Sequence, residues 1–142
     1  MKPDRPTVLV VGATGYLGGH LIKAFHNAGY IVHALARYPD KLKRLSSYID
    51  VIHVGEATKP ETLCGICDEA DLVISALGIT RQRDGLHYMD VDYQANRNML
   101  DEAIRADVKK FAYIHVLNAE LMPQVAMAAA KVKFAHELEE AA

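Results

Sequence analysis

The chain has 142 residues, of which 51% are hydrophobic and 24% are charged, and its formal net charge is −2 at pH 7. These values are ordinary for a soluble globular protein with a core of its own, so we expect one domain over residues 1–142. The balanced charge offers no basic surface for nucleic acid or an anionic membrane, and no segment approaches the ~20 apolar residues that span a bilayer. The N-terminus lacks the apolar stretch of a signal peptide, and two cysteines do not make a disulfide framework. The expected location is therefore cytoplasmic.

The first predicted strand, residues 7–11, leads directly into the glycine-rich sequence GATGYLG at residues 12–18. Gly12 allows a tight turn out of the strand, Gly15 lets the backbone approach a ligand without a Cβ, and Gly18 lets the next helix pack closely on the sheet. The start of that helix offers unpaired N–H groups and a partial positive charge. This order of strand, turn and helix is typical of a dinucleotide pyrophosphate site, although the spacing is G-x-x-G-x-x-G and not G-x-G-x-x-G.

Apolar and amphipathic segments alternate along the rest of the chain. Strands are predicted at 7–11, 31–36, 51–54, 72–76 and 111–116, and helices at 17–28, 39–46, 60–69, 87–106 and from 123 or 124 onward. This β-α-β-α alternation implies right-handed crossovers and an α/β fold with a doubly wound parallel sheet of the Rossmann-like type. Such a sheet often has six or more strands, and the last residues still have a helical pattern. We therefore expect the chain to be a truncated piece of a longer protein.

Five segments of the chain resemble the atypical short-chain dehydrogenase/reductase superfamily, in particular its NmrA-like and NAD(P)-binding oxidoreductase branches. They are VLVVGATGYLGGH (8–20), ALARYPDKL (34–42), ADLVISALGITRQRDG (70–85), YMDVDYQANRNML (88–100) and VKKFAYIHV (108–116). The resemblance covers nearly the whole chain and implies a Rossmann fold that binds NAD(P). Members of the superfamily are usually longer, with the substrate-binding part beyond the point where this chain ends.

The end of the second predicted strand is expected to select the cofactor. An acid there accepts hydrogen bonds from the 2′-hydroxyl of NAD, whereas an arginine pairs with the 2′-phosphate of NADP. Arg37 occupies this place, with Lys41 and Lys43 close behind it. Asp40 falls at the start of the next helix, where an acid complements the helix dipole. The charge pattern favours NADP as the cofactor, with NAD as the alternative.

The resemblance implies further contacts to the cofactor. Glu56 stands where relatives usually carry an Asp that accepts a hydrogen bond from the adenine amino group. The alternative interpretation of Glu56 is an exposed glutamate in a loop. Small residues after the fourth strand would let the backbone run along the adenosine ribose, and Ile79 and Thr80 are expected in the same cleft. The expected cofactor-binding residues are Gly12, Thr14, Gly15, Tyr16, Leu17, Gly18, Arg37, Glu56, Ala57, Ala76, Leu77 and Gly78.

The catalytic residues that the resemblance implies are incomplete. In many reductases of this superfamily a Tyr-x-x-x-Lys pair and a serine on the fifth strand carry the proton transfer. The last helix offers Lys131, but Met127 stands four residues before it, and Lys133 is preceded at that distance by an alanine. His115 stands at the end of the fifth strand, where the serine is missing. Lys131 is therefore the catalytic candidate, with a solvated helix cation as the alternative.

Three other features have a structural interpretation. His115, expected at the end of a central strand, could exchange a proton near the nicotinamide, but we favour a packed core histidine. Cys64 and Cys67 form a C-x-x-C without a second pair, which favours small buried hydrophobes over a zinc or redox site. Arg81 and Arg83 are interpreted as residues of a solvated loop. The alternative is that they contact a substrate or a partner. The seven histidines have no ligand spacing, so no metal site is expected.

The resemblance leaves three functions open. The leading hypothesis is an NADP-dependent oxidoreductase-type enzyme that acts on an unidentified small molecule, with that substrate and the nucleotide as its only expected partners. The rival is a non-catalytic regulator or scaffold of the NmrA-like type, which binds NAD(P) without turning it over. The missing tyrosine and serine favour the rival. A third option is an assembly module in which the nucleotide is structural.

Overall fold

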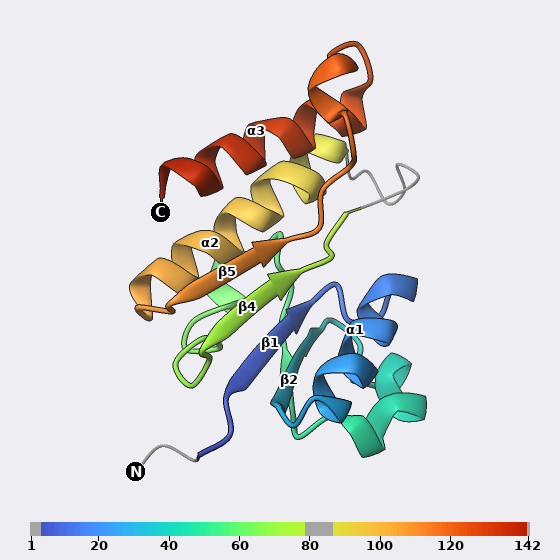
Figure 1. The fold of residues 1–142 in the computed structure, drawn as a ribbon, viewed down its shortest axis with the longest axis vertical. Coiled ribbons are helices and arrows are strands. Elements are labelled where there is room, and N and C mark those ends of the chain that lie inside the picture. The colour runs from blue at the N-terminus through green and yellow to red at the C-terminus, as the bar shows by residue number, and fades with distance from the viewer. Residues whose placement is uncertain (1–3, 79–86, 142) are drawn as a thin grey trace.

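The computed structural model describes residues 4–78 and 87–141. Within these ranges, five strands form one parallel sheet with the order β3-β2-β1-β4-β5. Figure 1 shows β2, β1, β4 and β5 side by side in this order. The strands are β1 (Thr7–Val11), β2 (Ile31–Ala36), β3 (Val51–Val54), β4 (Leu72–Ser75) and β5 (Lys110–Tyr113). The chain runs outward from β1 to β3 and then crosses to β4 and β5 on the other side of β1. The doubly wound α/β sheet predicted from the sequence is therefore confirmed.

Helices cover both faces of the sheet. The α-helices are α1 (Tyr16–Asn27), α2 (Asn96–Arg105) and α3 (Ala126–Glu140). The shorter helical segments are η1 (Pro39–Tyr48), η2 (Pro60–Thr62), η3 (Met89–Ala95) and η4 (Ala119–Leu121). α1 and η1 lie on one side, whereas α2 lies on the other, with α3 beside it (Figure 1). Phe134 of α3 packs against Phe111 and Tyr113 of β5. In the ranges that the structure describes, no helix is long and apolar enough to cross a membrane.

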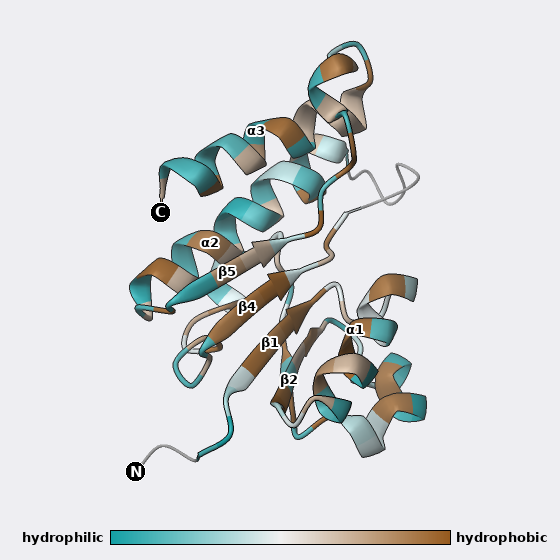
Figure 2. Cartoon of the chain, in the orientation of Figure 1, coloured by the Kyte–Doolittle hydropathy of each residue, from teal (hydrophilic) through white to brown (hydrophobic). Residues whose placement is uncertain are grey.

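Alternate residues of β1 supply two separate cores, one on each face. Val8 and Val10 are fully buried in a cluster that includes Ile22 of α1, whereas Leu9 is buried in a second cluster with Met99 of α2. Each such side chain stabilises the fold by roughly 1.5–3 kcal/mol when it is fully buried. Figure 2 shows that β1 and β4, at the centre of the sheet, are mostly apolar, whereas the helices carry both polar and apolar residues. Because β1 is buried on both faces, its carboxyl end is held in a fixed position.

The first three strands have the predicted bounds, but two predicted helices differ. The helix predicted over 60–69 is wrong, because η2 ends at Thr62 and Gly65 adopts a φ of +83°. That left-handed conformation cannot continue a right-handed helix. The helix predicted over 87–106 begins as the π-helical η3 and continues as α2, and the one predicted over 39–46 is the 3₁₀ segment η1.

The last predicted strand is too long. The sequence predicts it over 111–116, whereas β5 ends at Tyr113. Among the described residues β5 pairs only with β4, and Tyr113 lies opposite Ser75, the last residue of β4. β5 thus ends level with its partner β4. The strand predicted over 72–76 is one residue too long, because β4 ends at Ser75, opposite Val11 at the end of β1. The last helix begins at Ala126 and not at 123 or 124.

Candidate functional site

The turn after β1 is shaped by two glycines that face each other. Gly12 has a φ of +82°, and a Cβ there would lie 2.9 Å from the carbonyl carbon and oxygen of Ala76. A Cβ on Gly18 would collide with the carbonyl oxygen of Gly12. The N–H of Gly15 donates to the same carbonyl at 3.1 Å, which closes the turn. The backbone between β1 and α1 therefore has no room for side chains on its inner side.

The N-terminus of α1 opens from this turn toward solvent. Its cap residue is Gly15, which makes no side-chain capping bond, and no acid stands in the first turn of the helix. Helix N–H groups that no capping side chain satisfies attract an anion, and the helix dipole adds to the attraction. The first turn of α1 is thus a candidate site for a phosphate group.

A pocket of ≈ 250 Å³ lies over the carboxyl ends of β1, β2 and β4, beside this helix terminus. Its lining includes nine of the expected cofactor-binding residues, namely Gly12, Thr14, Gly15, Arg37, Glu56, Ala57, Ala76, Leu77 and Gly78. Tyr16 and Leu17 lie outside the lining and are 84% and 40% exposed, and Gly18 is buried beneath the turn. Ile79, Thr80, Arg81 and Arg83 lie outside the described residues.

The lining also contains residues that the sequence did not single out. Tyr38 follows Arg37 directly, and Val91 and Ala95 enter the pocket from η3. Val91 and Ala95 are four residues apart on a helical apolar face, a pattern that predicts burial but not which cavity the face covers. Lys41 also lines the pocket, and its Nζ and the guanidinium of Arg37 each lie 5.4 Å from the centre of the Tyr38 ring.

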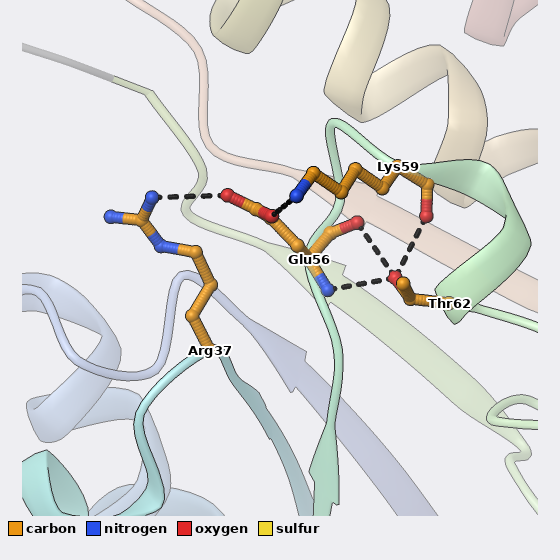
Figure 3. A network of polar contacts seen from close by, with 4 residues as sticks. All are labelled: Arg37, Glu56, Lys59 and Thr62. Atoms are coloured by element: carbon orange, nitrogen blue, oxygen red, sulfur yellow. Dashed lines mark hydrogen bonds and ion pairs between the residues drawn. The ribbon is translucent and has the colours of Figure 1, made fainter. Parts of the chain in front are cut away.

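One carboxylate stands among the cations at the mouth of the pocket (Figure 3). Arg37 donates from Nη1 to Oε1 of Glu56 at 3.1 Å, and Nζ of Lys59 lies 3.1 Å from Oε2 of the same residue. The hydrogen bond from Arg37, followed by that from Lys59, lowers the pKa of Glu56. Glu56 is therefore an ion-paired residue at the pocket, and its side chain is only 24% exposed.

The loop that carries Glu56 is fixed by Thr62 (Figure 3). The N–H of Glu56 donates to Oγ1 of Thr62 at 2.8 Å, and this hydroxyl lies 2.7 Å from the carbonyl oxygen of Lys59. Gly55 permits the approach, because a Cβ there would lie 2.9 Å from the carbonyl oxygen of Thr62. Glu56 and Lys59 are thus held on one short turn next to the end of β2.

A buried polar cluster fixes the backbone at the carboxyl end of β4. The hydroxyl of Ser75 donates to Oδ1 of Asn96, and the N–H of Leu77 donates to Ser75 Oγ at 3.2 Å. Nδ2 of Asn96 donates to the carbonyl oxygens of Leu77 at 3.2 Å and of Asp92 at 3.0 Å. Asp92 and Asn96 were not predicted as site residues. The sequence signal for them was two polar residues four positions apart in a helical pattern. Where such a pair is buried it needs hydrogen-bond partners, which indicates a polar cluster.

Lys131 of α3 is buried and paired, so its interpretation as a solvated helix cation is wrong. Its Nζ lies 2.6 Å from Oδ1 of Asp92, which is fully buried. A Cβ on Gly78 would lie 2.7 Å from that oxygen and 2.8 Å from the Lys131 nitrogen. The backbone that lines the pocket therefore passes directly beside the ion pair. Met127 lies on the same helix, and Lys133 is exposed, with its Nζ 4.1 Å from the centre of the Tyr93 ring.

His115 follows an edge strand, not a central one, because β5 is the last strand of the sheet. Both of its ring nitrogens are buried without a hydrogen-bond partner in the described ranges, and so is the hydroxyl of Tyr113. Burial, followed by the charge of Asp92, raises the pKa of Tyr113. The rings of Tyr113 and Phe134 meet edge to face with centroids 4.8 Å apart. The Tyr113 ring therefore lies on the side of β5 that α3 contacts, and the His115 ring lies next to it.

The two cysteines have different environments. Cys67 is buried, and burial raises the pKa of its thiol to about 12, whereas Cys64 is exposed. The interpretation as small buried hydrophobes therefore holds for Cys67 and is wrong for Cys64. No group of three or more potential metal ligands occurs in the part of the chain that the structure describes.

A doubly wound parallel sheet, a glycine turn before a helix and a pocket at the strand ends define a Rossmann-type nucleotide-binding domain. A family model described as NAD(P)H-binding matches residues 12–142, so the chain belongs to this NAD(P)H-binding family. This membership fits the atypical short-chain dehydrogenase/reductase superfamily that the sequence segments resemble.

Known proteins of different kinds are similar to the chain. Photosystem II assembly factor Ycf39 of Synechocystis sp. is 34% identical over 83% of this chain and 36% of its own length. Divinyl chlorophyllide a 8-vinyl-reductase of Cucumis sativus is 28% identical over 99% of this chain and 36% of its own length. The chain thus spans about a third of these curated relatives. A short chain dehydrogenase of Burkholderia cenocepacia, solved with NADP, superimposes with a TM-score of 0.81 at 21% identity, over 99% of this chain and 67% of that one. At this identity the likeness shows the fold.

Proposed function

We propose that this chain is the NADP(H)-binding part of an oxidoreductase-type protein that acts on a small molecule. The observation that carries the proposal is the guanidinium of Arg37 at the mouth of the pocket that begins at the glycine turn. An arginine beside the adenosine ribose favours a 2′-phosphate through charge-assisted hydrogen bonds. The nucleotide and a small-molecule substrate are the proposed partners, in the cytoplasmic location that the composition favours.

We assign a different part of the nucleotide to each group of lining residues. The N–H groups at the start of α1 would bind the pyrophosphate, because no capping side chain or acid competes for them. Arg37 and Lys41 would face the 2′-phosphate, and Leu77 and Val91 offer apolar surface in the same pocket. When bound, the nicotinamide supplies or accepts a hydride.

Lys131 is the proposed catalytic residue. Its ammonium group lies beside Gly78 of the pocket lining, and Asp92 fixes its position at 2.6 Å. A fixed ammonium group at this place would hold ribose hydroxyls and stabilise negative charge on a reacting oxygen. Asp92 acts on the reaction through Lys131 and is in this sense a positioning residue.

The test of the cofactor assignment is a fluorescence titration of the protein with NADPH and with NADH. We expect tighter binding of NADPH, and we expect Arg37→Ala to remove this preference by weakening NADPH binding alone. Lys43→Ala is the matched control, because Lys43 is an exposed cation near Arg37 that pairs with Asp40 and lies outside the pocket. Equal affinities for the two nucleotides, or a preference that survives in the Arg37 variant, would overturn the assignment.

A second candidate function is a nucleotide-binding regulator or scaffold without turnover. It is supported by Met127 at the place where the superfamily's tyrosine is expected, and by the similarity to a protein named as an assembly factor. Oxidation of bound NADPH in the presence of a panel of carbonyl compounds would support the enzyme. Tight binding of NADPH with no turnover of any compound would support the regulator.

A further inference from the structure

Arg37 is already engaged by an anion of this chain. Each carboxylate oxygen of Glu56 has its own cation, Arg37 on Oε1 and Lys59 on Oε2, both at 3.1 Å (Figure 3). Arg37 and Glu56 line the pocket, whereas Lys59 does not. The carboxylate therefore stands between a cation on the pocket side and a cation on the outer side.

A nucleotide 2′-phosphate and Glu56 would compete for the same guanidinium. Both are anions, and their mutual repulsion rises as they approach one cation, so they cannot both pair closely with Arg37 at low cost. The side chains of Arg37 and Glu56 are 43% and 24% exposed, which leaves them free to rearrange at the pocket mouth. Lys59, at 61% exposure, offers Glu56 a partner outside the pocket.

We propose that Glu56 is the counter-charge that a 2′-phosphate replaces on Arg37, and that Lys59 retains Glu56 after the exchange. The inference rests on the proposed function, because it requires that the 2′-phosphate binds at Arg37. It makes Glu56 a residue that sets the preference between phosphorylated and unphosphorylated dinucleotides. Lys59 acts through Glu56, without touching the nucleotide, and is a positioning residue.

The first test compares NADPH and NADH affinities of the wild-type protein with those of Glu56→Gln. Removal of a partly exposed competing charge should tighten NADPH binding roughly 2- to 5-fold and change NADH binding by less than about 2-fold. Glu61→Gln is the matched control, since Glu61 is an exposed acid in the same segment and lies outside the pocket. Thermal unfolding of each variant verifies that it is folded.

The second test asks whether Lys59 acts through Glu56. Lys59→Gln should weaken NADPH binding roughly 2- to 5-fold in the wild-type background, because the displaced carboxylate loses its second partner. In the Glu56→Gln background the same substitution should have no effect, which is the signature of coupling between two residues. An equal effect in both backgrounds would show that Lys59 attracts the nucleotide directly and would overturn its assigned role.

Other outcomes for Glu56→Gln overturn the exchange in distinguishable ways. Equal weakening of both nucleotides would assign Glu56 to the adenine amino group, as the family resemblance implies. Weakening of NADH alone would assign it to the ribose 2′-hydroxyl, and unchanged affinities would remove it from recognition. Failure of the proposed function looks different: the wild-type protein would then show no NADPH preference that Arg37→Ala removes.

A measurement on the unmodified protein keeps the inference testable if a variant does not fold. The ¹³C resonance of the Glu56 carboxylate should shift more with NADPH than with NADH, because only the 2′-phosphate displaces it from Arg37. Equal shifts with the two nucleotides would contradict the exchange.

Discussion

Gly18→Ala is the substitution that most directly tests the packing of the glycine turn. A Cβ at this position would collide with the carbonyl oxygen of Gly12 and lie 2.8 Å from the Cα of Ala13. Both are backbone atoms at the end of a fully buried strand, so neither can turn away as a flexible side chain would. Either α1 moves off the sheet or the turn opens.

The size of the effect is the difference between two opposing contributions. Insertion of a methyl group into a packed region costs about 1–3 kcal/mol, and a contact between backbone atoms should fall at the upper end of that range. Alanine in a helix stabilises by up to about 1 kcal/mol relative to glycine. We therefore expect Gly18→Ala to lower the free energy of unfolding by about 2 kcal/mol, with a fall in Tm of roughly 6–10 °C.

Gly19→Ala is the matched control on the same turn of α1. A Cβ there would lie 3.6 Å from the nearest atom, a side-chain methyl group of Leu45, which is an ordinary contact. The helix propensity then acts alone, and we expect a gain of about 0.5–1 kcal/mol. Urea unfolding of the two variants measures both values. If Gly18→Ala is as stable as the wild-type protein, or if the two variants behave alike, the turn is not closely packed at Gly18.

Two further predictions concern buried titratable groups. Asp92→Asn should lower the free energy of unfolding in urea by about 3–5 kcal/mol, because it leaves the Lys131 ammonium buried without its charge partner. A decrease of less than about 1 kcal/mol would contradict this. Burial, followed for His33 by the nearby His53, lowers the pKa of both histidines, whose rings meet at 3.0 Å between Nδ1 and Nε2. The unfolded chain then binds more protons, so the free energy of unfolding should fall as the pH drops below about 6.5 and stay level above it. His53→Gln should flatten this dependence, and an equally steep fall in that variant would exclude the pair as its source.

The sheet was predictable where burial on both faces leaves an unbroken apolar run. β1 and β2, which are buried along nearly their whole length, have the bounds that the sequence predicts. The partly exposed edge strand β3 has its predicted bounds as well, and Gly12 turns the chain where the motif places the turn. The helix predicted over 60–69 does not form, because Gly65 has a positive φ. The local sequence could not predict this, since an isolated glycine adopts positive and negative φ about equally readily. The end of β5 depends on the length of β4, which is a property of pairing and not of the local sequence.

The candidate site was predictable as a set of positions but not as a set of contacts. Arg37 and Glu56 were each expected near the cofactor for separate reasons, yet their ion pair depends on the register between β2 and β3, which aligns residues far apart in the chain. The burial of Lys131 was also not predictable, because an amphipathic pattern does not show which neighbouring element covers a helix. Its pairing with Asp92 follows from the contact between α3 and η3.

A crystal structure of the protein grown with NADPH is the direct test of the pyrophosphate site at the glycine turn. We predict a diphosphate at the N-terminus of α1, within hydrogen-bond distance of the main-chain N–H groups of Gly15 and Tyr16, with the 2′-phosphate on Arg37. A nucleotide bound elsewhere, or a glycine turn closed over an empty pocket at saturating NADPH, would contradict it.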